Sequence, residues 1–449
     1  MAGKLTYREK RNLTLFIISY IINNLASGVL YDTYVNYLQE VSVSIATSFW
    51  AFYGYATFIS AAILLLVPKV GYKKILVFCT IGTSAAFFGA VLLPSIVILK
   101  ITTLFALTGV QIHFIILAPY VAVYTESLGD DGIKWYTRTY YMGYVGYFLA
   151  TYLGGVLVVK AFSLVSGITY QAAKEATRFI AEMTIGQHAA YLTGNEYVLL
   201  AVGILGLLAL IPVLLIKEEP QDYRKAVSES EEKPSLGERI KIGSKILLNR
   251  DAMFYLIFWA LISFAMGLFT SYYTVFLNRN LHIDKATSSL MVSISYVAII
   301  VFMFFTPLAV KKLGKVGTIF FAVLLSVPFM LIIAKGDSFG NLMVPAVGTA
   351  LFIRAGLANL SSPAESALSM SVVPKEMRPA YTAVVNFVAG IISILSGTFT
   401  GKVLFMTQEG YRQAYYIAAV LYAIAAAVVL FGLRKYNRKE DTEEECYVA

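Results

Sequence analysis

The chain has 449 residues, of which 58% are hydrophobic and only 14% are charged, and its mean hydropathy is +0.70. Such a composition leaves too few charged groups to cover a water-soluble protein, so the chain is expected to lie in a membrane. Its two cysteines, Cys79 and Cys446, provide neither a disulfide framework nor a metal-ligand spacing. No cofactor and no metal site is therefore expected.

Twelve apolar runs follow one another along the chain. A spanning helix needs about 20 mostly apolar residues because every backbone polar group must be satisfied within the segment. The first run is too long for a signal-peptide core and lacks a small-residue cleavage site, so we expect it to be retained as a helix. The predicted spans are 13–37, 46–67, 75–94, 100–125, 138–159, 197–216, 252–277, 287–310, 316–334, 342–366, 380–401 and 413–433.

Two longer segments separate these spans. Residues 217–251 mix acids, bases, prolines and serines, which is typical of a solvated linker between two halves, 1–216 and 252–433. Residues 434–449 form a polar tail. The segment 160–196 is expected to contain a short surface helix, because apolar residues recur there at helical spacing: Tyr170, Ala173, Ile180 and Met183.

The positive charges predict the orientation. With the N-terminus in the cytoplasm, about 26 of the 36 lysines and arginines fall on the cytoplasmic side and about nine on the outer side. An even number of spans then places both termini in the cytoplasm of a cell-membrane protein. The net charge of +9 thus reflects membrane topology, and no nucleic-acid partner is expected.

Landmarks in the two halves recur at a nearly constant spacing of 239 to 243 residues. The stretch "SGVLYDTYVNYL" at 27–38 aligns with "MGLFTSYYTVFL" at 266–277. Three further pairs share this spacing: Gly71 with Gly314, Glu126 with Glu365, and Arg138 with Arg378. Because transporter folds commonly contain repeats, we expect an all-α integral membrane protein of twelve helices in two pseudo-symmetric six-helix halves.

With these features the chain resembles the major facilitator superfamily of transporters over almost its whole length. The stretches "RAGLANLSSP" and "VVPKEMRPA" are loosely similar to the tenth-helix region of bacterial drug-efflux-like and glycolipid-flippase-like members. The superfamily's loop signature after the second helix has a glycine, an aspartate and then basic residues. Here Leu64 and Pro68 replace the glycine and the aspartate, whereas the basic part is kept by Lys69, Gly71, Lys73 and Lys74.

The resemblance implies that this loop helps to lock one state of the transporter, so Lys69, Gly71 and Gly314 are candidate gating residues. The second-half copy also lacks the acid and has Lys311. Four charged residues lie at predicted inner helix ends: Glu126, Arg138, Glu365 and Arg378. We expect them to form gating salt bridges rather than to bind substrate.

Polar side chains inside spans are the candidates for a transport path, because an ionised group near mid-membrane is disfavoured by about 2.5–3.5 kcal/mol. Asp32 continues a polar row with Asn24 on the first span, and it is either a path-lining group or a structural hydrogen-bonding group near the outer mouth. Arg354 lies at mid-depth in the tenth span, with Ser361 and Glu365 following on the same predicted face. It either attracts an anionic ligand, holds a carboxylate such as Asp32, or joins helices.

His113 lies near the middle of the fourth span and is either a proton carrier or a hydrogen-bonded packing residue. Helix five is rich in tyrosine, with Tyr140, Tyr144 and Tyr147 at helical spacing. Such rings suit organic or amphipathic ligands, although packing and interfacial anchoring explain most membrane tyrosines.

The chain is not expected to be an enzyme, because it has no phosphate-binding loop and no paired carboxylates at hydrolase spacing. We therefore expect a secondary transporter that moves a small organic solute by alternating access, coupled to protons, and works as a monomer among membrane lipids. A lipid or glycolipid flippase on the same fold is the nearest alternative. A non-transporting sensor or scaffold is a more distant one.

Overall fold

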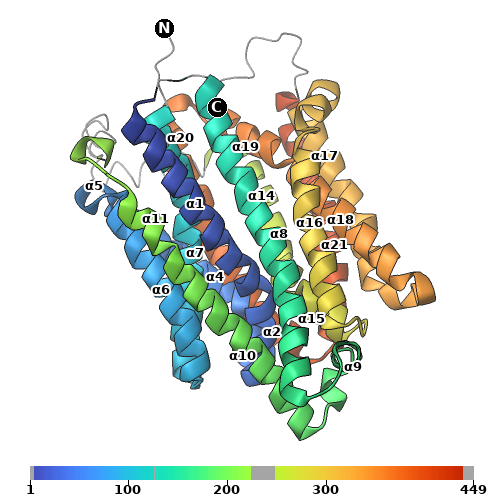
Figure 1. The fold of residues 1–449 in the computed structure, drawn as a ribbon. Helices are drawn as coiled ribbons and strands as arrows, with labels where there is room; N and C mark the ends of the chain where they lie inside the picture. Colours follow the sequence, from blue (N-terminus) through green and yellow to red (C-terminus); the bar gives the residue numbers. More distant parts are fainter. Residues whose placement is uncertain (1–4, 126–127, 129, 224–247, 438–449) are drawn as a thin grey trace. The chain divides into compact units, whose positions relative to one another are not determined.

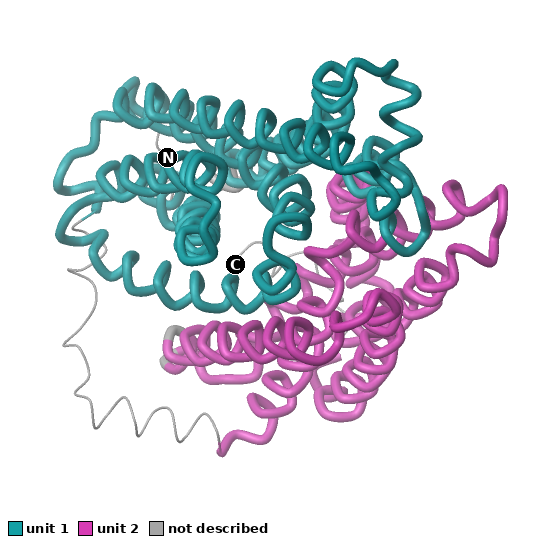
Figure 2. The backbone as a smooth tube through the Cα atoms, turned by 90° about the horizontal axis from the view of Figure 1, so that it is seen from below, with its two compact units in different colours: residues 1–231, 277–293 teal, residues 232–276, 294–449 magenta. Residues whose placement is uncertain are grey.

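The computed structural model describes the chain except for residues 1–4, 126–127, 129, 224–247 and 438–449. Every regular element within the described residues is a helix (Figure 1). The chain forms two compact units, coloured separately in Figure 2. The first unit comprises residues 1–231 and 277–293, and the second comprises residues 232–276 and 294–449. Residues 277–293 thus pack with the first unit, whereas the predicted division ran at the linker.

The first unit begins with α1, whose start is fixed by a capping box between Thr6 and Glu9. A second capping box, between Thr184 and Gln187, starts α10. The helices up to the linker are α1 (Tyr7–Val29), a π-helical turn (Leu30–Tyr34), α2 (Val35–Val41), α3 (Val43–Thr47), α4 (Phe49–Leu64), α5 (Val67–Val70), α6 (Tyr72–Leu92), α7 (Ile96–Thr125), α8 (Asp130–Ser166), α9 (Tyr170–Ala176), α10 (Ile185–Leu208) and α11 (Leu210–Leu215).

After the linker, Asn249 caps the first helix by accepting hydrogen bonds from two backbone N–H groups. The helices are α14 (Arg250–Phe269), a 3₁₀ turn (Thr270–Tyr272), α15 (Tyr273–Arg279), α16 (Lys285–Met303), α17 (Thr306–Ala334), α18 (Met343–Leu360), α19 (Ser362–Ser371), α20 (Arg378–Lys402) and α21 (Glu409–Leu433). Helices α15 and α16 cross the boundary between the units.

The predicted twelve-helix architecture is confirmed. Among the described residues, eleven helical segments are long and apolar enough to span a membrane. The shorter apolar helix α4, which comes second in chain order, completes the set of twelve. The ends differ from the prediction because helical hydrogen bonding continues past the apolar stretch: the fifth helix extends to Ser166 and the sixth begins at Ile185. A short helix, α9, forms in the segment 160–196, and Ala173 is its buried residue. It ends at Ala176, so the predicted stripe is not continuous: Ile180 lies in a separate 3₁₀ turn (Ile180–Glu182) and Met183 follows that turn.

The repeat is visible in the local backbone of each unit. The first spanning helix is interrupted by the π turn at 30–34, and its counterpart is interrupted by the 3₁₀ turn at 270–272. Gly71 and Gly314 adopt nearly the same conformation, with φ of 85° and 75°. A side chain is strained at such φ values, so both loops require glycine.

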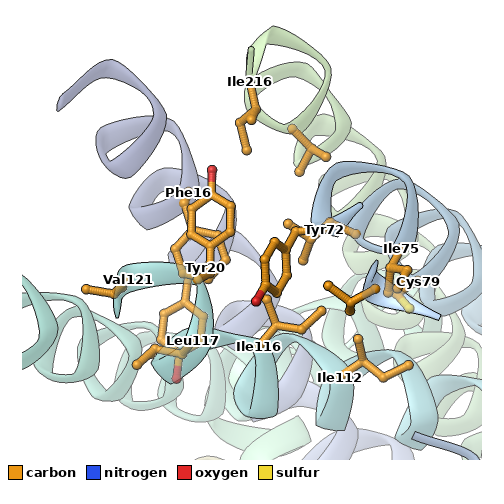
Figure 3. Close-up of a cluster of buried hydrophobic side chains, with 14 of the residues drawn as sticks. Phe16, Tyr20, Tyr72, Ile75, Cys79, Ile112, Ile116, Leu117, Val121 and Ile216 are labelled. Carbon is orange, nitrogen blue, oxygen red and sulfur yellow. The ribbon is translucent and has the colours of Figure 1, made fainter. Parts of the chain in front are cut away.

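A cluster of buried side chains holds the first unit together between α1, α6 and α7 (Figure 3). The Tyr120 ring stacks on Phe16, with centroids 4.4 Å apart, and meets the edge of Tyr72 at 5.5 Å. Because lipid is as apolar as these side chains, the cluster stabilises the unit through close packing rather than through removal from water.

Candidate functional site

A buried ion pair lies at the π turn of the first spanning helix. The Lys285 ammonium donates to Asp32 Oδ1 at 2.7 Å, and the Ser289 hydroxyl donates to Asp32 Oδ2 at 2.8 Å. The Lys285 and Asp32 side chains are 0% and 2% exposed. Both carboxylate oxygens therefore have a donor, and the acid predicted from sequence is paired inside the first unit.

Two neighbouring glycines on α8 allow this cluster to form. A Cβ on Gly155 would lie 2.4 Å from the Ser289 side chain, and one on Gly154 would lie 2.9 Å from Thr33 Oγ1. The backbone N–H of Lys285 donates to Thr177 Oγ1 at 3.1 Å, which fixes the start of α16. The lack of a side chain at these two positions of α8 allows α16 to lie close enough to reach Asp32.

A second charged group stands at the end of α2. His188 Nε2 is 2.9 Å from Glu40 Oε2, and Arg279 donates to the other oxygen of the same carboxylate. Glu40 is largely buried, with 9% of its side chain exposed. Neither this group nor Lys285 and Ser289 was predicted from sequence. The available signal was a lysine and a serine four residues apart at the start of a span, which share one helix face.

Asn24 and His113 make contacts that suit packing. Asn24 Nδ2 donates to the Tyr20 carbonyl at 2.7 Å, and the side chain lies against Gly143 and Gly146 of α8. His113 is fully buried, and its two ring nitrogens lie within hydrogen-bond distance of the Gly109 carbonyl and the Thr80 hydroxyl. With both nitrogens engaged by neighbouring protein groups, the hydrogen-bonded packing interpretation of His113 is the one that the contacts favour.

The tyrosines of α8 form a column on one side of that helix. The Tyr140 and Tyr144 hydroxyls are 3.1 Å apart, and the Tyr147 ring stacks near Tyr31 at 6.4 Å between centroids. These contacts stabilise the column within the first unit. They leave its ligand-binding role a prediction.

Arg354 lies in the second unit and is held by hydroxyl groups and aromatic rings. Its guanidinium donates to Tyr273 Oη at 2.6 Å and to Tyr422 Oη at 2.7 Å. Its Cζ is 4.5 Å from the centroid of Phe269. These partners all belong to the second unit, and the role of Arg354 in a transport path stays a prediction.

The other residues of the tenth helix and the following loop are not arranged as predicted. Pro363 near the start of α19 cannot donate a backbone hydrogen bond, and α18 ends at Leu360, so the expected continuous polar face is interrupted. Ser361 donates to Glu365 Oε1 at 2.6 Å, and Arg378 donates to the Met370 carbonyl at 2.9 Å. These contacts lie within the second unit, and the gating role of Glu365 and Arg378 stays a prediction.

The equivalent charged residues of the first repeat are Glu126 and Arg138. Arg138 is exposed, whereas Glu126 lies outside the described residues. Within the part of the chain that the structure describes, no group of three or more acidic, histidine or cysteine side chains is arranged to hold a metal ion.

Comparison with known proteins identifies the fold. The family model described as Major Facilitator Superfamily matches residues 13–397. The chain belongs to the major facilitator superfamily. A comparison with curated proteins finds no match.

Solved structures of superfamily transporters share this fold. The nucleoside transporter NupG is 13% identical, with a TM-score of 0.70 over 95% of this chain and 100% of that chain. A bacterial homolog of the human lysosomal transporter Spinster is 14% identical, with a TM-score of 0.68 over 97% and 98%. A D-xylose–proton symporter is 14% identical, with a TM-score of 0.64 over 94% and 97%.

The superfamily loop after the second spanning helix lacks its aspartate here. An acidic side chain from another part of the chain, Glu218, contacts the end of this loop instead. Glu218 follows the sixth spanning helix and accepts hydrogen bonds from the backbone N–H groups of Tyr72 and Lys73, at 2.8 and 3.1 Å. A carboxylate at these N–H groups favours the start of α6. Burial raises the pKa of the Glu218 carboxyl above its ordinary value, although the two N–H groups oppose this.

The second superfamily repeat uses an amide in the equivalent place. Asn437 Oδ1 accepts from the Gly317 N–H at 2.9 Å, and a Cβ on Gly314 would lie 2.3 Å from that oxygen. On Gly71 a Cβ would similarly lie 2.4 Å from Glu218 Oε2. The exposed Lys69 lies just before Gly71. In both units, therefore, a polar side chain following the last spanning helix lies against the glycine of the loop.

Proposed function

We propose that this superfamily member is a secondary active transporter of the cytoplasmic membrane, which moves a small organic solute by alternating access coupled to protons. The observation that supports the proposal is the buried ion pair of Asp32 and Lys285 at the break in the first spanning helix. In this proposal both termini face the cytoplasm, the protein works as a monomer among lipids, and it catalyses no chemical reaction.

The pair suits proton coupling because its net charge depends on whether Asp32 is ionised or protonated. With Asp32 ionised, the two charges compensate each other and Ser289 holds the second oxygen. Protonation of Asp32 leaves the buried Lys285 charge without a counter-ion, which disfavours this arrangement. A proton drives a conformational equilibrium only if it binds the two conformations with different affinity. Because protonation removes the counter-ion of Lys285 in the paired conformation, Asp32 should bind a proton less tightly there than in a conformation in which the pair is separated.

The position of the pair in the chain suits alternating access. Asp32 belongs to the first six-helix repeat, whereas Lys285 and Ser289 belong to the second, yet all three pack within the first unit. A movement that detaches residues 277–293 from α1 would separate the charges and open Asp32 to water. We therefore assign Asp32 as the proton-binding group and Lys285 as the group that senses its ionisation.

Purified full-length protein in proteoliposomes tests this assignment. A panel of nucleosides, monosaccharides and organic acids is screened for solute-evoked current under an imposed pH gradient, and an active solute is then used in labelled form. Asp32→Asn mimics the protonated acid at nearly constant volume, so we expect lost accumulation against a gradient and retained exchange. Asp337→Asn, which changes a half-exposed acid, is the matched control and should accumulate solute normally.

Two results would count against the proposal. Accumulation by Asp32→Asn at the wild-type level would remove Asp32 from the coupling role. A wild-type protein that moves no member of the panel in either direction, although it is folded, would count against transport of small organic solutes and favour the flippase or sensor alternatives.

A further inference from the structure

Arg354 is a buried positive charge that has no acidic partner among the described residues. The residue is 5% exposed, and its guanidinium donates hydrogen bonds to the hydroxyls of Tyr273 and Tyr422. Its guanidinium lies over the Phe269 ring and, at 5.7 Å, over the Tyr422 ring. Hydroxyl groups and ring faces stabilise the charge without neutralising it.

Two other arginines of the protein, Arg8 and Arg412, each form a salt bridge with an aspartate. Arg8 pairs with Asp222 at 2.7 Å, and Arg412 pairs with Asp337 at 2.8 Å. Both lie near helix ends, where a charge is less costly than at mid-depth. Arg354, near the middle of the candidate span Gly336–Ser371, lacks the carboxylate that these two have.

The hydrogen-bonding capacity around Arg354 is also incomplete. A guanidinium has five N–H donors, and Arg354 Nε is buried with no acceptor. The Tyr415 hydroxyl is buried without a partner as well. The Tyr415 ring stacks on Phe269, with centroids 5.4 Å apart. Arg354 Nε and the Tyr415 hydroxyl are thus two unsatisfied donors on side chains that both contact Phe269, and each unsatisfied buried group is costly.

The 3₁₀ turn between α14 and α15 positions these residues. Phe269 is the last residue of α14 and Tyr273 is the first residue of α15, so the 3₁₀ turn between them sets one ring over the guanidinium and one hydroxyl onto it. Two further hydroxyls at the turn, Thr270 Oγ1 and Ser271 Oγ, are buried without partners. The turn therefore adds donors to the same part of the second unit.

We propose that Arg354, with the aromatic residues Phe269, Tyr273, Tyr415 and Tyr422, forms a subsite for the oxyanion group of the transported molecule, a carboxylate or a phosphate. The planar guanidinium fork matches such groups in a bidentate geometry. The flanking rings suit a flat apolar part next to the charge. This inference rests on the proposed transport function and narrows its substrate to an organic anion, whether soluble or the headgroup of a lipid.

Thermal unfolding of the purified full-length protein tests the subsite without requiring transport. The probes are benzoate and phenyl phosphate, each compared with a neutral analogue, benzamide or benzyl alcohol. Binding to the folded state raises the unfolding temperature by mass action. We expect the anions to stabilise the wild-type protein more than the neutral analogues do, and Arg412→Gln, a matched control at a paired arginine, to respond like the wild type.

Two variants link the effect to Arg354. Arg354→Gln should abolish the difference between anionic and neutral probes. Arg354→Lys keeps the charge but loses the fork, so it remains informative if the first variant does not fold, and it should weaken anion binding about tenfold. Equal stabilisation by neutral and anionic probes, or anion binding in Arg354→Lys at the wild-type level, overturns the subsite.

Vesicle composition distinguishes the two sources of the anion. Protein in equal parts of phosphatidylglycerol and phosphatidylcholine is compared with protein in phosphatidylcholine alone, with and without benzoate. Arg354-dependent stabilisation by phosphatidylglycerol that competes with benzoate assigns a lipid headgroup, whereas benzoate stabilisation that is independent of lipid assigns a soluble anion. Anion binding without any solute flux would support the subsite and count against the transport proposal. Flux of neutral solutes only would support the transport proposal and count against the subsite.

Discussion

The Asp32 carboxylate and the Lys285 ammonium lie 2.7 Å apart although 253 positions separate them in the sequence, and both side chains are buried. A buried pair contributes little net stability relative to apolar residues of similar size, because desolvation offsets the attraction. Removing one partner is different, since it leaves the other charge buried alone. The net contribution of the pair to stability is therefore small, whereas the loss of either partner is costly.

Lys285→Met should destabilise the protein by about 3–5 kcal/mol, because the Asp32 carboxylate then keeps only the Ser289 hydroxyl. The double variant Asp32→Asn with Lys285→Met should lose less than the sum of the single variants, which unfolding in detergent would measure as a coupling energy. Arg412→Met, at an exposed pair, should cost about 0–1 kcal/mol. Additive losses in the double variant would show that the two charges do not interact.

Gly155→Ala should loosen the contact between α8 and α16, because the new Cβ would lie 2.4 Å from the Ser289 side chain. Overpacking of this kind costs about 1–3 kcal/mol. Gly186→Ala provides a control because a Cβ there has nothing within 4 Å. Thermal unfolding of both variants would measure the difference, and equal melting temperatures would mean that the close approach is absent.

Hydropathy predicted the twelve helices because the length of an apolar run is a local property of the sequence. It also placed Asp32 and Arg354 inside spans, which identified them as costly residues. Their partners are not local: Lys285 is distant in sequence, and nothing in one sequence selects Tyr273 and Tyr422 from 31 tyrosines. Long-range pairing of this kind depends on the packing of the folded chain.

The predicted salt bridges illustrate the same limit in the other direction. Glu365 and Arg378 were expected to form interface salt bridges from their charge and position, yet within the second unit Glu365 accepts from Ser361 and Arg378 donates to the Met370 carbonyl. A side chain pairs with the group that its local backbone brings within reach, and the interruption of the tenth helix before Pro363 decides this here. The helix break itself was not predicted, although a proline at that position was the available signal.

Gly71→Ala should cost more than a left-handed backbone conformation alone. Gly71 and Gly167 have φ values of 85° and 68°, so alanine is strained at both, by about 1–2 kcal/mol. Only at Gly71 would the new Cβ also meet Glu218, at 2.4 Å. The difference in unfolding free energy between Gly71→Ala and Gly167→Ala thus isolates the contact with Glu218. No difference would show that the carboxylate moves away freely.

Cysteine accessibility tests the orientation that the positive charges predict. In a background with Cys79 and Cys446 replaced by serine, a cysteine at position 178 should react with an impermeant maleimide in intact cells. One at position 69, which is also exposed, should react only after the membrane is permeabilised. The opposite pattern would reverse the topology and place the termini outside.

Glu218 should make the stability of the protein depend on pH at mildly acidic values. Burial raises the pKa of its carboxyl in the folded state, so the folded protein binds a proton more tightly than the unfolded chain does. Between the ordinary pKa of about 4.3 and the raised folded value, the folded state therefore holds more protons, and the free energy of unfolding decreases as pH rises. Above both values the cost of the buried charge is fully present, and below both it is absent.

Glu218→Gln keeps an acceptor for one backbone N–H and cannot ionise, so it should remove this decrease from a series of unfolding curves measured across the window. Glu182→Gln, at an exposed acid, should leave the decrease in place. A Glu218→Gln protein with the same pH dependence as the wild type would show that the titration belongs to another group.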